Sequence, residues 1–186
     1  MSQPKFLSEF VRKLVNIDIE VKSKKWLELK NIEKFIESQA LNILAKSPLL
    51  EFLDKKINFD LSISLCSNLQ IRKINREFRG KDKPTNVLSF GNLDEKIIQQ
   101  SGLNKAIGVN KYIFLGDIIL GYEYILKEAS DNEKDFKNHL THLLLHGILH
   151  LLGHDHEDAK MANIMENLEI KILQEFNINN PYKNEI

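Results

Sequence analysis

The chain of 186 residues carries 26 basic and 26 acidic side chains, so its formal net charge is zero and its overall charge does not favour nucleic acid or an anionic membrane. Hydrophobic residues make up 42% and charged residues 28% of the sequence, which excludes disordered, collagen-like and disulfide-scaffold proteins. This length and composition predict one domain, spanning residues 1–186, with a substantial hydrophobic core.

Cys66 is the only cysteine, so the chain can form neither an intrachain disulfide nor a cysteine-based zinc site. A single cysteine fits a reducing compartment. The first residues, MSQPKFLSEFVRKLVNIDIEV, lack the continuous apolar segment of a signal peptide, and no stretch approaches the roughly 18 apolar residues that span a bilayer. We therefore expect a cytoplasmic protein that does not act at a membrane.

Alternating and helical patterns divide the first half of the chain. Residues Leu14 to Val21 alternate between apolar and polar side chains, which predicts a first strand. Apolar residues at helical spacing predict one long amphipathic helix from Lys24 to Leu50. The alternating segment Asn58 to Cys66 predicts a second strand, and Ser67 to Arg79 predicts a helix that ends at Gly80.

Two short apolar runs, Val87 to Phe90 and Ile113 to Leu120, predict buried strands in the second half. The polar segment between them, Gly91 to Lys111, is longer than most ordered loops. It predicts a loop insertion over about residues 92–111.

Two helices are predicted in the last third of the chain, from Asp135 to Leu152 with a stop at Gly153, and from Asp158 to Phe176. No element is predicted between residues 121 and 134. Strands mixed with helices in one chain indicate an α/β or α+β fold with a mixed sheet.

The segment HGILHLLGHDH, His146 to His156, places four of the six histidines within eleven residues of a leucine-rich stretch. On a helix, His146 and His150 lie on one face about 6 Å apart, close enough to bind one metal ion. Gly153 permits the chain to turn back, which brings His156 within reach, while His154 is expected to point elsewhere. Three neutral imidazoles with an open fourth position are typical of a catalytic zinc site, and the helix C-terminus favours a cation.

The same helix face carries His139 and His142. Because His142 lies about 12 Å along the axis from His150, these two cannot share an ion. We expect His139 and His142 to be structural or to support the metal ligands, hydrogen-bonded along the helix face. Asp155 is interpreted either as a support for a ligand or as a turn residue. A histidine pair at i, i+4 alone is more often core or surface than ligand, so the metal prediction depends on the third histidine. Nickel or copper would also suit three imidazoles.

The spacing H-x-x-x-H-x-x-G-x-x-H is that of the metzincin proteases, whose motif begins His-Glu. Gly147 occupies the position of that glutamate, which in the proteases is the general base. A peptidase built on this site would therefore lack its base.

A basic segment, RKINREFRGKDK, runs from Arg72 to Lys83 with six basic and two acidic residues, a local charge of +4. Such a run is often only a solvated helix face. Beside a metal site, however, a cationic strip is also what binding to a phosphate backbone requires.

Three segments, HGILHLLGHDH, NREFRGKDKPTNVLSF and LGDIIL, together resemble the YbeY family of metal-dependent, single-strand-specific endoribonucleases, over roughly Asn58 to Leu173. The resemblance implies that His146, His150 and His156 bind one zinc ion, and that Arg79 is the catalytic arginine near the metal. It also implies a single mixed sheet of about four strands surrounded by helices, with the histidine helix at the centre.

The function implied by the resemblance is cleavage of single-stranded RNA in ribosomal RNA processing, at the 3′ end of 16S rRNA, and in ribosome quality control. The expected partners are ribosomal RNA and the ribosome or its subunit, with no role for DNA or a membrane. Two alternatives stay open. One is a zinc metallopeptidase-like hydrolase, and the other is a non-catalytic, zinc-containing ribosome assembly factor whose metal site is closed by His154 or another group.

Overall fold

A computed structural model describes residues 10–49, 57–94, 105, 107, 111–156 and 158–182. Its centre is a four-stranded sheet in the order β1-β2-β4-β3. The strands are β1 (Val15–Val21), β2 (Asn58–Cys66), β3 (Val87–Gly91) and β4 (Tyr112–Gly121). The first three in sheet order are parallel, and β3 pairs antiparallel with β4, with Ser89 opposite Ile118. The expected α+β fold with a mixed four-stranded sheet is confirmed.

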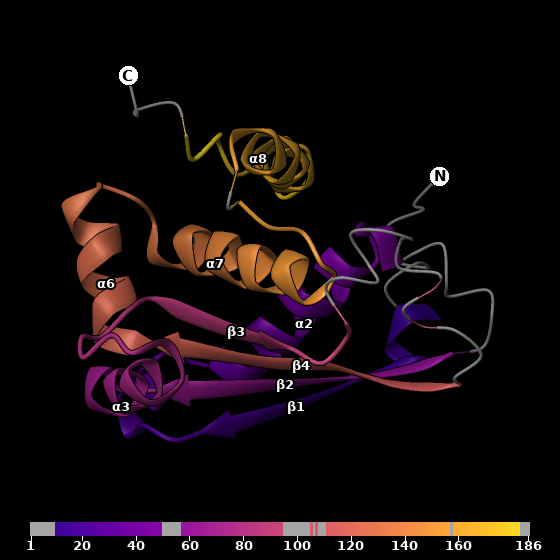
Figure 1. Ribbon diagram of the computed structural model, residues 1–186. Coiled ribbons are helices and arrows are strands. Elements are labelled where there is room, and N and C mark those ends of the chain that lie inside the picture. The colour runs from indigo at the N-terminus through magenta and orange to yellow at the C-terminus, as the bar shows by residue number, and fades with distance from the viewer. Residues whose placement is uncertain are drawn as a thin grey trace.

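Helices cover both faces of the sheet. They are the 3-10 helix η1 (Lys24–Glu28) and the α-helices α2 (Ile32–Leu44), α3 (Asn68–Arg79), α6 (Tyr122–Asp131), α7 (Phe136–Leu151) and α8 (Ala159–Glu175). Figure 1 shows α7 lying along one face of the sheet, with α8 on its outer side. Neighbouring residues of β4 belong to different apolar clusters, Ile118 to that of α2 and α7 and Ile119 to that of α3, so α3 covers the opposite face.

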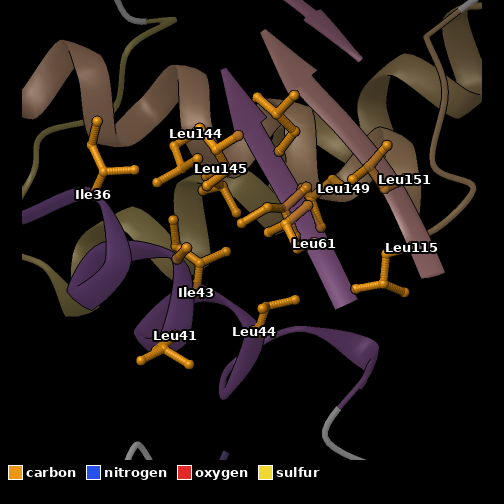
Figure 2. Packing of buried hydrophobic residues seen from close by; sticks show 14 of the residues in the cluster. Ile36, Leu41, Ile43, Leu44, Leu61, Leu115, Leu144, Leu145, Leu149 and Leu151 are labelled. Carbon is orange, nitrogen blue, oxygen red and sulfur yellow. The ribbon is translucent and has the colours of Figure 1, made fainter. Parts of the chain in front are cut away.

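The larger apolar cluster explains why α7 is rich in leucine. Leucines from α7 pack against α2, β2 and β4 (Figure 2), and the labelled members are Ile36, Leu41, Ile43, Leu44, Leu61, Leu115, Leu144, Leu145, Leu149 and Leu151. Each fully buried side chain of this kind stabilises the fold by roughly 1.5–3 kcal/mol. The expected central position of the histidine helix is confirmed, because α7 has the sheet on one side and α8 on the other.

Capping residues fix several of the predicted helix boundaries. Ser67 and Gln70 form a capping box at the start of α3, and Gly80 ends that helix with a left-handed backbone at φ 67°. Asp135 and Asp158 cap α7 and α8 by accepting backbone N–H bonds.

The long helix predicted from Lys24 to Leu50 is wrong, because two helices replace it. The 3-10 helix η1 ends at Glu28, Leu29 is extended, and Asn31 adopts the left-handed region at φ 59° before α2 begins. The break turns Trp26 into the core, where its indole N–H donates to the carbonyl of Cys66. Helix α2 ends at Leu44, and the predicted end at Leu50 lies outside the described residues.

Helix α6 was not predicted. It follows β4 directly and buries Tyr122, Ile125 and Ala129, which share one helical face. The helix has only ten residues and carries the chain from β4 to α7. Most of the predicted insertion over 92–111 lies outside the described residues, at 95–104, 106 and 108–110. Among the described helices, none has the length and apolar character needed to cross a membrane.

Candidate metal centre

Three histidines meet where α7 ends. His146 and His150 lie one turn apart on α7, with their Nε2 atoms 3.1 Å from each other. His156 comes from the following loop, and one nitrogen from each of the three rings lies within 4.8 Å of the others. Within the described part of the chain, this is the group of histidine, cysteine and acidic side chains that could hold a metal ion.

The loop after α7 is shaped by local hydrogen bonds. Gly153 has φ 85°, and its N–H donates to the carbonyl of His150, while the N–H of His154 donates to Leu149. The carboxylate of Asp155 accepts the backbone N–H of His156 at 2.7 Å, so Asp155 serves as a turn residue. This geometry is the predicted turn at a glycine just beyond the helix.

The imidazoles suit a cation. Burial, together with the neighbouring His146 and His156, lowers the pKa of His150 to about 4, so that ring is neutral at pH 7. Nitrogen ligands about 2.1 Å from a tetrahedral zinc ion lie about 3.4 Å apart, close to the 3.1 Å between the two Nε2 atoms on α7. His154 is partly buried, which lowers its pKa, and it stands outside the group of three.

A buried carboxylate supports the first of these histidines. Glu169 on α8 is 0% exposed and accepts hydrogen bonds from His146 Nδ1 at 2.9 Å and from His142 Nε2 at 3.0 Å. Burial by itself raises the pKa of Glu169, but the bonds from these two histidines outweigh it and lower the pKa to about 2. Glu169 is therefore a carboxylate at neutral pH.

His139 and His142 are hydrogen-bonded, as expected, but their partners come from other helices. His139 Nε2 lies 2.8 Å from Glu128 on α6, and His142 contacts Glu169 on α8. Sequence reasoning missed both acids. Glu169 could have been noticed, because it interrupts the buried stripe of α8 formed by Met165, Ile172 and Leu173.

The histidines open onto a cleft of about 590 Å³. Its lining includes Arg79, Lys81, Lys83, Ser89, Tyr124, His146, His150, His154 and His156. Arg79 is anchored on β3, because its Nη2 donates to the carbonyl of Ser89 at 3.2 Å and its guanidinium lies 5.6 Å from the ring centre of Phe90. Arg79 and the three histidines thus share one cavity.

Some basic side chains of the segment Arg72–Lys83 pair with a carboxylate, and others do not. Asp82 accepts two hydrogen bonds from Arg72 and lies 3.8 Å from Arg76. Among the described side chains, no ion pair joins Arg79, Lys81 or Lys83 to a carboxylate. Arg79, Lys81 and Lys83 therefore bring to the lining of the cleft positive charge that no described carboxylate pairs with.

Gly147 packs against the sheet. A Cβ atom built on it would lie 3.1 Å from Ser89 Oγ and 3.2 Å from Ile118 Cδ1. Gly147 stands where metzincins have their general base, and here side chains of β3 and β4 occupy the space beside it. A side chain longer than that of glycine would contact these strands.

Comparisons with known proteins place the chain in a family. Residues 18–177 match the family model described as "Endoribonuclease YbeY". A curated relative, "Endoribonuclease YbeY" of Ruthia magnifica subsp. Calyptogena magnifica, is 41% identical over 154 residues, covering 81% of this chain and 98% of the relative. The solution structure of TM1509 from Thermotoga maritima matches with a TM-score of 0.49 and 25% identity, covering 87% of this chain and 92% of that one.

The packing of Gly147 generates a prediction. Replacing Gly147 with Glu should lower the free energy of unfolding by at least about 1–3 kcal/mol, because the side chain overpacks the sheet and buries a charge. The variant should gain no peptidase activity. Urea unfolding measures the free energy of unfolding, and a casein digestion assay measures peptidase activity. Gly147→Ala, which adds a smaller and uncharged side chain, is the control. A stable Gly147→Glu protein that digests casein would contradict this account.

Proposed function

This chain belongs to the YbeY family of endoribonucleases, and we propose that it is a zinc-dependent enzyme that cleaves phosphodiester bonds in single-stranded RNA. The observation that carries the proposal is the shared cavity, whose lining includes the three histidines and the guanidinium of Arg79. We further propose that the substrate is ribosomal RNA, with maturation of the 16S rRNA 3′ end and ribosome quality control as the setting, and the cytoplasm as the location.

The proposed metal ligands are His146, His150 and His156. They fit zinc because all three are nitrogen donors on a short stretch of chain, and His150 is neutral at pH 7. When bound, zinc would supply Lewis acidity, which polarises a phosphoryl oxygen and makes water a stronger acid.

Arg79 is the proposed catalytic residue. Its bond to the carbonyl of Ser89 uses one of five N–H donors and fixes the guanidinium at the edge of the cleft. The remaining donors can bind the nonbridging oxygens of a phosphate, where negative charge increases during cleavage. Lys81 and Lys83, which line the same cleft, would hold the neighbouring phosphates of the strand.

Exposed aromatic side chains support a preference for single strands. Tyr124 lines the cleft, and Phe78, 63% exposed, packs edge-on against Phe90 next to Arg79. Unpaired bases can stack on aromatic rings and on arginine, whereas bases within a duplex cannot leave their stack without cost.

The two alternative functions have less support. A peptidase would need a base at Gly147, where the strands leave little space. A closed structural zinc site would need a fourth protein ligand, and His154 lies outside the ligand group.

Replacing Arg79 with Ala should leave bound zinc unchanged and slow RNA cleavage by about 10²- to 10³-fold, because a donor to the developing charge is lost. The rate on a labelled single-stranded RNA and the zinc content of the same sample measure this. Arg76→Ala is the matched control, since Arg76 lies on the same helix outside the cleft lining and should retain most activity. Full activity in Arg79→Ala would remove Arg79 from the mechanism.

Replacing His156 with Ala should abolish both zinc binding and cleavage, because the loop then supplies no ligand. His154→Ala, two residues away in the same loop, should keep both. Zinc content after gel filtration and cleavage of the same RNA distinguish the two variants, with circular dichroism as the check on folding. Loss of zinc from His154→Ala but not from His156→Ala would overturn the ligand assignment.

A further inference from the structure

Glu169 joins three parts of the chain at one buried point. Its Oε1 accepts from His146 Nδ1, and its Oε2 accepts from His142 Nε2 and from the hydroxyl of Tyr182. The three donors come from two turns of α7 and from the segment after α8. No surface of Glu169 remains exposed.

Packing alone gives no reason for a carboxylate at this position. The neighbours of Glu169 on the same face of α8 are Met165, Ile172 and Leu173, all buried. A leucine would continue that stripe, whereas a buried charge costs free energy unless it is paired and hydrogen-bonded. The hydrogen bonds to α7 must therefore account for the acid.

The bond to His146 determines which nitrogen of that ring carries the proton. A carboxylate only accepts hydrogen bonds, so Nδ1 of His146 must be the donor. In the neutral ring, Nε2 then has a free lone pair, and Nε2 is the atom that lies 3.1 Å from His150 Nε2. The bond thus presents the required nitrogen toward the other two histidines.

We propose that Glu169 is the positioning residue of the metal centre: it holds His146 in the Nδ1–H tautomer and in the orientation that the ion requires. His142 and Tyr182 in turn hold the second oxygen of Glu169, which gives the extra histidine on the α7 face a role. Because Glu169 lies on α8 and Tyr182 follows that helix, the way these segments pack on α7 affects the affinity of the site for metal. The inference rests on the proposed metal centre.

The test compares zinc affinities measured by competition with a chelator. Glu169→Gln should bind zinc about 10- to 100-fold more weakly than the wild-type protein. The matched control is Glu128→Gln, because Glu128 also accepts from a buried histidine of α7, His139, which is not a proposed ligand. That control can lose stability but should keep the wild-type zinc affinity. Equal affinities in Glu169→Gln and wild type would overturn the proposal.

A second measurement uses only the wild-type protein, so its result does not depend on whether a Glu169 variant folds. Long-range proton–nitrogen NMR spectra of metal-free wild-type protein, labelled with ¹⁵N-histidine, report the tautomer of His146 directly. The proposal requires the Nδ1–H form, and the Nε2–H form would overturn it. If wild-type protein binds zinc no better than His156→Ala, the metal centre itself fails, and the tautomer still decides whether Glu169 orients the ring.

Discussion

The structure depends on one constraint: imidazoles on a helix packed between a sheet and another helix must each find a polar partner. Burying an unpaired polar group costs free energy, and helices α6 and α8 supply a carboxylate partner to one nitrogen of each of three rings, while the Nδ1 atoms of His139 and His142 have no hydrogen-bond partner among the described residues. Glu128 pairs with His139, and Glu169 pairs with His142 and His146. Toward the C-terminal end of α7, the Nε2 atoms of His146 and His150 lie 3.1 Å apart and close to His156, an arrangement that could hold a metal ion.

Local signals predicted much of this fold. Capping residues and a glycine mark the ends of α3, and the histidine spacing predicted the cluster at the C-terminal end of α7. The helix predicted over 24–50 was wrong because Asn31 adopts a left-handed backbone that interrupts it, and because Trp26 is buried through a bond to Cys66, 40 residues away. Glu169 lies 23 residues from His146, so only the packing of α8 on α7 reveals the pair.

The packing of α7 on the sheet brings the two halves of the site together. Close packing at Gly147 seats the helix on β3, and β3 in turn anchors Arg79 through the carbonyl of Ser89. The same strand therefore lies between the histidines and the basic segment and brings them to one cleft. A chain with no net charge can in this way present a local cationic surface to a phosphate backbone.

The most direct test is a zinc titration of metal-free wild-type protein, with cleavage of a labelled single-stranded RNA as the readout. The account predicts no cleavage without metal, a rate that rises to a plateau at one zinc per chain, and resistance of a duplex of the same sequence. Cleavage that persists without metal, or a protein that holds one zinc and leaves the single strand intact, would contradict it.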